Sequence, residues 1–187
     1  LYPDTNNNFF TYEELINDIK KTQTNKEGKT IILYASNADE QDSYIKAAEN
    51  KGYKVLLLDS PIVSHLIQKL ESKKENISFS RVDSDSIDNL IKKDDNTISK
   101  LDDKEKEKLK AYLEDVISKE KYTIQIEALD SEELPFIITQ PEFVRRMKDM
   151  QQSGGNNMFG SMPEIHNVIV NVNNDLVNTI FKAKSKS

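Results

Sequence analysis

The sequence predicts an α/β unit followed by an α+β unit. Strand-like and helix-like segments alternate through residues 1–83, which is the pattern of a compact layer on a parallel sheet with right-handed crossovers. The second half instead holds a helix, three strand-like segments and an amphipathic segment. A charged segment without periodicity separates the two halves. We therefore expect the α/β domain over residues 1–83, a linker over 84–101 and the α+β domain over 102–187.

The first half opens on a loop and continues with a helix and two strands. The helix is predicted from Thr11 to about Gln23, because a threonine caps its start and its apolar residues fall on one face. Residues 30–35 and 53–58 are almost continuously apolar and of strand length. Such runs are typical of strands in a sheet that is covered on both faces.

Two more helices and an edge strand complete the predicted α/β unit. One helix is expected over about residues 39–50, because Gly52 follows it at the position where glycine commonly ends a helix. The second begins at Ser60-Pro61. Residues 77–82 alternate between apolar and polar, which favours a strand at the edge of the sheet.

The second half is expected to fold as α+β. A helix with a buried stripe and a highly charged outer face is predicted over residues 102–120. Residues 122–129 and 135–139 are rich in strand formers and flank a short acidic turn, so we expect an antiparallel hairpin. Residues 165–172 form a third strand, and a last helix covers residues 175–183.

Residues 141–163 hold all four methionines and three of the five glycines. With Pro141 as the first helical residue, Phe143, Met147 and Met150 fall at i, i+4 and i+7, which makes one apolar stripe. The stripe is either buried within its own domain or an exposed, adaptable binding surface. Methionine suits the second role, since its flexible side chain accommodates many partner shapes.

Composition excludes several classes of protein. The net charge of −6 argues against a nucleic-acid groove, which needs clustered lysine and arginine. The absence of cysteine fits a reducing compartment, and no run is long and apolar enough for a membrane span. We expect a cytoplasmic protein that binds neither nucleic acid nor membrane. Because the chain begins with Leu1, we also expect a fragment of a longer protein.

Catalytic constellations are scarce in the sequence. His65 and His166 are the two histidines and lack zinc-site spacing, and there is no glycine loop for phosphate. One enzyme hypothesis uses Asp59, Asp83 and Asp85, which follow predicted strands and would hold Mg²⁺ for phosphoryl transfer. In the alternative interpretation, Asp59 only caps the next helix.

Several segments resemble the heat-shock protein 90 chaperone family, most closely its bacterial members. They are KVLLLDSPI at 54–62, LPFIIT at 134–139 with RRM at 145–147, and residues 171–177, which are similar to the family pattern Asn-Pro-x-His-x-Leu-Val. Val172 departs from that pattern, and His65 stands where relatives can carry tryptophan. The likeness covers the whole chain, as the end of the middle domain joined to most of the carboxy-terminal domain.

The resemblance implies an ATP-driven, dimeric chaperone that grips non-native client proteins through an exposed apolar helix. ATP and Mg²⁺ would be bound before Leu1 in the full-length protein, and the helices of the homodimer would follow Ser187. This fragment itself would be neither an enzyme nor a cofactor-binding protein. Matched by position, the client-contacting residues would be Ser64, His65, Gln68, Phe143, Met147 and Met150.

Overall fold

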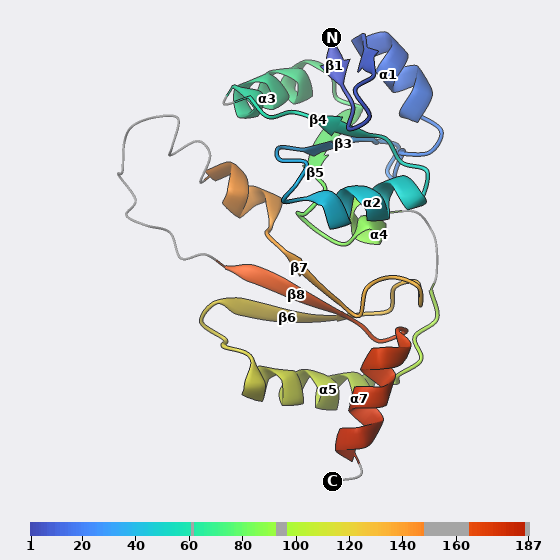
Figure 1. The fold of residues 1–187 in the computed structure, drawn as a ribbon, viewed down its shortest axis with the longest axis vertical. Coiled ribbons are helices and arrows are strands. Elements are labelled where there is room, and N and C mark those ends of the chain that lie inside the picture. The colour runs from blue at the N-terminus through green and yellow to red at the C-terminus, as the bar shows by residue number, and fades with distance from the viewer. Residues whose placement is uncertain (61, 93–96, 148–164, 186–187) are drawn as a thin grey trace. The chain divides into compact units, whose positions relative to one another are not determined.

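The computed structural model describes residues 1–60, 62–92, 97–147 and 165–185 (Figure 1). The chain divides into two compact units. Of the described residues, 1–92 and 142–147 belong to the first unit, and 97–141 and 165–185 to the second.

The first unit is built on a parallel three-stranded sheet of strand order β4-β3-β5. A short antiparallel ribbon, β1 with β2, precedes it. The elements in chain order are β1 (Tyr2–Pro3), β2 (Phe9–Phe10), α1 (Tyr12–Ile19), β3 (Thr30–Ala35), α2 (Asp42–Asn50), β4 (Val55–Leu57), α3 (Val63–Lys73), β5 (Ile77–Arg81) and α4 (Ile87–Leu90), followed much later in the sequence by helical residues 142–147. β5 lies at one edge of this sheet, as its alternating sequence predicts.

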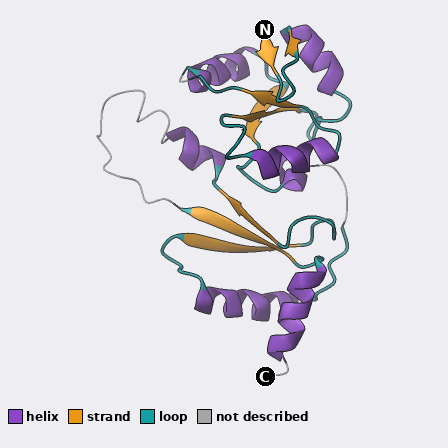
Figure 2. Cartoon of the chain, viewed as in Figure 1, coloured by secondary structure: helices purple, strands orange, loops and turns teal. Residues whose placement is uncertain are grey.

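Strand β3 is buried along its whole length because both faces of the sheet are covered. Ile31, Leu33 and Ala35 pack into one apolar cluster, with residues of α2 and α4. Ile32 and Tyr34 point to the opposite face and pack with residues of α1 and α3. Figure 2 shows these two helical pairs on opposite sides of the sheet. The continuous apolar run of the sequence follows directly from this two-sided burial.

Residues 84–92, expected to be linker, instead belong to the first unit and contribute to its core. Ile87, Leu90 and Ile91 are buried beside Val82. The Ser86 side chain caps the one-turn helix α4 by accepting from the Asn89 backbone N–H. Four helical residues are too few to show a period of 3.6, so the periodicity of the sequence does not reveal α4.

The second unit contains α5 (Asp103–Val116), β6 (Tyr122–Glu127), β7 (Phe136–Thr139), β8 (His166–Asn171) and α7 (Asp175–Ser185). The start of α5 is fixed by a capping box between Asp102 and Glu105. Its inner stripe packs with residues of β6, β8 and α7 in a single apolar cluster.

The hairpin expected between β6 and β7 is wrong, because β8 lies between these two strands. β8 runs parallel to β6 and antiparallel to β7. Its residues Val168, Ile169 and Val170 are at most 6% exposed. A strand that is apolar on both faces buries the most apolar surface at the centre of a sheet. The free energy of this burial outweighs the preference of β6 and β7 to pair across their short connection.

Buried asparagines hold the end of β8 to two loops. The Asn171 side chain accepts from the Leu129 N–H at 3.2 Å and donates to the Asp130 carbonyl at 2.7 Å. The Asn173 side chain accepts from the Lys100 N–H at 2.8 Å and donates to the carbonyls of Leu129, at 2.9 Å, and Ile98, at 3.1 Å. These contacts give the asparagine-rich segment at 171–177 a structural role.

Candidate functional site

Helix α3 presents an exposed face. Val63, Ile67 and Leu70 pack inward against the apolar cluster on one face of the first sheet. On the outer side His65 and Gln68 are exposed, and Ser64 is half-buried. Apolar surface accompanies them, since Ile62 is 68% and Leu66 36% exposed. The three client-contacting residues expected on this helix therefore lie on or beside an open, partly apolar face.

The second part of the expected site is the helix formed by residues 142–147. Phe143 is 73% exposed, whereas Arg145 is only 5% exposed. Met147 is half-buried. Met150 and the glycine-rich segment after it lie outside the described residues. The interpretation of the stripe as part of the buried core is therefore wrong for Phe143.

The arrangement of Phe143 and Arg145 follows from helical geometry. Successive residues of an α-helix are rotated by about 100°, so two positions apart correspond to about 200°. A helix that buries Arg145 must turn Phe143 away from the body of the unit. Met147, four positions after Phe143, lies only about 40° from it around the axis.

Arg145 contacts both Glu142 and Tyr34. Its guanidinium donates to Glu142, at 2.6 Å from Nη2 to Oε1 and 3.2 Å from Nε to Oε2. It also donates to the hydroxyl of Tyr34, a fully buried residue of β3. The guanidinium carbon lies 5.6 Å from the centre of the Tyr34 ring. The buried charge is thus neutralised by a carboxylate and hydrogen-bonded by a phenol.

Arg146 joins the same helix to α3 and β5. Its Nη1 and Nη2 donate to the two carboxylate oxygens of Glu71, at 2.8 and 3.2 Å. Nη2 also donates to the Phe79 carbonyl at 2.9 Å, and Nε to Glu142 at 2.8 Å. Glu71 in turn accepts from the Phe79 backbone N–H at 2.7 Å. One guanidinium therefore links a helix, a strand and a second helix.

The electrostatics of this cluster favour the charged forms of Glu142 and Arg146 and the neutral form of Tyr34. Burial raises the pKa of Glu142, but hydrogen bonds and charge from Arg145 and then Arg146 outweigh burial and hold that pKa below its ordinary value. Burial lowers the pKa of Arg146, but hydrogen bonds to Glu71 and Glu142 and the charges of these two carboxylates raise it by more. The net shift is upward. Burial, followed by the Glu142 charge, raises the pKa of Tyr34.

Sequence reasoning missed this cluster. The spacing of residues 141–150 places Arg145 and Arg146 opposite the apolar stripe but does not show what they contact; in the structure Arg145 is buried and Arg146 is partly buried. A signal was present, since Glu142 precedes the two arginines by three and four positions, the spacing of helical ion pairs. The pairing of Arg146 with Glu71, 75 positions away, has no counterpart in local sequence.

The carboxylates of the magnesium hypothesis are used in other ways. Asp83 is paired with Arg81 through two hydrogen bonds, of 2.6 and 2.9 Å. Asp85 accepts from the Ser86 N–H and from the Asn89 amide, and Asp59 is exposed. Within the described ranges, no group of three or more potential metal ligands is found.

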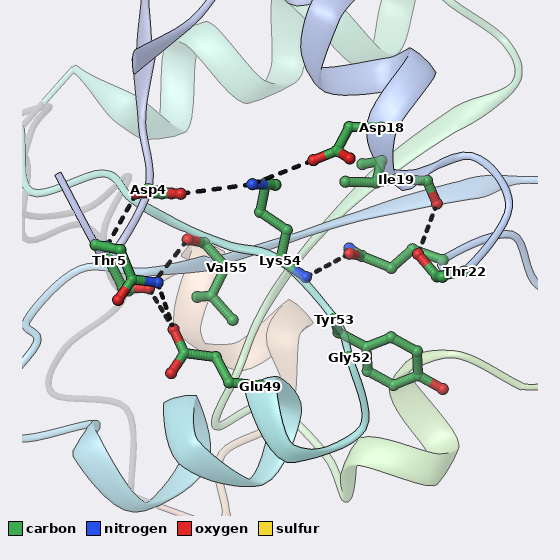
Figure 3. Close-up of a pocket in the computed structure, with 12 residues that line it drawn as sticks. Asp4, Thr5, Asp18, Ile19, Thr22, Glu49, Gly52, Tyr53, Lys54 and Val55 are labelled. Carbon is green, nitrogen blue, oxygen red and sulfur yellow. Dashed lines mark hydrogen bonds and ion pairs between the residues drawn. The ribbon is translucent and has the colours of Figure 1, made fainter. Parts of the chain in front are cut away.

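The first unit also contains a polar pocket of about 380 Å³ beside the amino-terminal ribbon (Figure 3). Lys54 lies between Asp4, at 3.5 Å, and Asp18, at 3.1 Å. Glu49 accepts from the Thr5 hydroxyl at 2.7 Å. These charges hold the first residues of the chain against β4 and its flanking helices, and this pocket was not predicted from the sequence.

Comparison with known proteins shows which proteins the chain resembles. The chain is 40% identical over 184 residues to the chaperone protein HtpG of Bacteroides thetaiotaomicron, a match that covers 96% of the chain. It is 39% identical over 190 residues to HtpG of Bacteroides fragilis and 35% identical over 191 residues to HtpG of Porphyromonas gingivalis. The chain is a relative of the HtpG chaperones. The resemblance to the heat-shock protein 90 family is thereby confirmed.

The match covers nearly all of the chain but only part of each HtpG protein. The chain spans only 27% of the Bacteroides thetaiotaomicron protein and 28% of the other two. No protein-family model matches the sequence. Among the described helices, none has both the length and the apolar character that a membrane crossing requires.

Proposed function

We propose that the chain is a client-binding segment of an ATP-dependent molecular chaperone. It grips non-native proteins through the exposed faces of α3 and of the helix that begins at residue 142. The observation that carries the proposal is Phe143, an aromatic side chain left 73% exposed in a chain related to HtpG. An exposed aromatic side chain beside other exposed apolar residues is typical of a protein-binding surface.

The client surface is composite. The client-contacting residues are Ser64, His65 and Gln68 on α3 with Phe143 and Met147 on the later helix, and Met150 continues that stripe in the sequence. Its partners are unfolded or partly folded proteins, which offer extended segments with apolar side chains. Each contact contributes little energy, so binding is weak and tolerant of sequence.

The remaining activities belong to the longer protein. We propose that ATP and Mg²⁺ bind outside this segment, that the segment alone does not hydrolyse ATP, and that the full-length protein is a cytoplasmic homodimer. The support is the length comparison, because the chain corresponds to about a quarter of the HtpG relatives.

Replacing Phe143 with aspartate tests the client surface. Burying a phenylalanine side chain is worth about 1.5–3 kcal/mol, and 73% of this one is open, so we expect about 6- to 40-fold weaker binding. The ligand is a fluorescently labelled, permanently unfolded protein such as reduced, carboxymethylated α-lactalbumin, and the readout is anisotropy. Stability in urea is expected to change by no more than ~0.5 kcal/mol.

Phe9→Asp is the matched control. Phe9 is also an exposed phenylalanine of the first unit, at 62%, but it lies on β2 and outside the proposed surface. Its replacement is expected to leave binding unchanged. Equal losses in the two variants, or no loss in Phe143→Asp, would show that the surface is not where clients bind.

A further inference from the structure

The polar cluster around Arg146 connects the two helices of the proposed surface. Glu71 lies on α3, one turn after Gln68, and is fixed by the Phe79 N–H of β5. Arg146 is three positions after Phe143 on the other helix and forks onto both oxygens of Glu71. The exposed face of α3 therefore lies within one helical turn of Glu71, and Phe143 lies within one turn of Arg146. Glu71 and Arg146 form one ion pair.

The geometry of the cluster restricts the later helix in two directions. Arg146 holds it to α3 and to the β5 backbone, and Arg145 holds it to Tyr34 of β3. Glu142 accepts hydrogen bonds from both arginines and so couples the two anchors. A helix fixed at two points on one side neither rolls nor slides easily, and Phe143 stays turned outward.

The donor set fits arginine specifically. Arg146 directs N–H groups to Glu71, Glu142 and the Phe79 carbonyl at the same time, which needs a planar, multidentate cation. Lysine carries the same charge on a single nitrogen and cannot reproduce this fork. Replacing Arg146 with lysine therefore separates the effect of the positive charge from the effect of the hydrogen-bond geometry.

We propose that Arg146 and Glu71 are positioning residues for client binding, which lock the 142–147 helix to α3 so that Phe143 and the His65–Gln68 face meet one extended apolar client segment together. This inference rests on the proposed function and adds to it the reason why two separate helices act as one surface. The Arg146–Glu71 pair preorganises the surface for binding. Without it, the helix would have to be ordered when the client binds, and the entropy cost would weaken the affinity.

The test measures the affinity of Arg146→Gln for the labelled, unfolded lactalbumin. We expect roughly 2- to 30-fold weaker binding, the range for residues that act through a coupled element. Hydrogen exchange of the backbone amides at 142–147 is expected to accelerate in parallel. Lys46→Gln is the matched control, since it breaks the exposed Lys46–Asp42 pair of the same unit and should change neither readout.

Two further variants separate positioning from other roles. Arg146→Lys is expected to bind clients as weakly as Arg146→Gln; full rescue by lysine would show that only charge matters and overturn the proposal. Combining Arg146→Gln with Phe143→Asp should add little to the loss from Phe143→Asp alone, because both act on the same contact. Fully additive losses would mean that Arg146 touches the client independently, which also overturns it.

The outcomes distinguish the two proposals. If Phe143→Asp has no effect, the client surface itself is wrong. If Phe143→Asp weakens binding while Arg146→Gln does not, the surface stands and the lock fails. Should Arg146→Gln fail to fold, Glu71→Gln removes the same pair from the other side and is judged by the same criteria.

Discussion

Asn173→Ala should destabilise the second unit by about 3–4 kcal/mol. The side chain is 4% exposed and makes hydrogen bonds to one backbone N–H and two carbonyls. Each such bond contributes about 1 kcal/mol net, and groups left unpaired in a buried site cost more. The magnitude is large for a single side chain because Asn173 joins the segments around Lys100 and Leu129 to the end of β8.

Hydrogen exchange at the β8 amides is the suitable assay, because it reports on the second unit by itself. A loss of 3–4 kcal/mol accelerates exchange through global opening of that unit by roughly 100- to 1,000-fold. Thr97→Ala removes an exposed polar side chain from the same unit, so it is the control and should change the rates little. A change of less than tenfold in Asn173→Ala would refute the argument that these hydrogen bonds hold the unit together.

Two predictions concern the first unit, and urea unfolding measures both. Because the pKa of Glu142 is lowered in the folded state, the stability from its ionised form is complete above the ordinary glutamate pKa of about 4.3 and disappears as the pH falls through the lower, folded value. Glu142→Gln should therefore be less stable than the parent at neutral pH and approach it in acid; a constant difference would contradict this. Gly52→Ala should cost about 1 kcal/mol, because Gly52 has a φ of +74° after α2, and an unchanged stability would show that alanine adopts this conformation without strain.

Local patterns predict the strands of the parallel sheet in the first unit, but not the short ribbon of β1 and β2, which the sequence assigns to a loop. β3 is recognisable because both of its faces are apolar, and β5 because only alternate positions are. The same signals indicate that β8 is a strand, but they do not say where it lies in its sheet. Its insertion between β6 and β7 depends on pairing across more than 25 residues, and turn chemistry between β6 and β7 favours the wrong neighbour.

The candidate site was predictable in part. The spacing of Phe143 and Met147 gives an amphipathic stripe, but spacing alone does not say whether the stripe or the opposite side faces solvent. Arg145 decides this, since it is buried against Tyr34 and turns Phe143 outward. Local patterns do not predict a buried arginine, because its partner lies 111 positions earlier in the chain.

The position of β8 has a consequence for biosynthesis. It is the last of the described strands but the middle strand of its sheet, so β6 and β7 have no shared partner until residues 166–171 have left the ribosome. During translation, the second sheet therefore cannot close progressively from its amino-terminal strand. The sheet is complete only once β8 is present, and before then the strand edges of β6 and β7 are open to pairing with other chains.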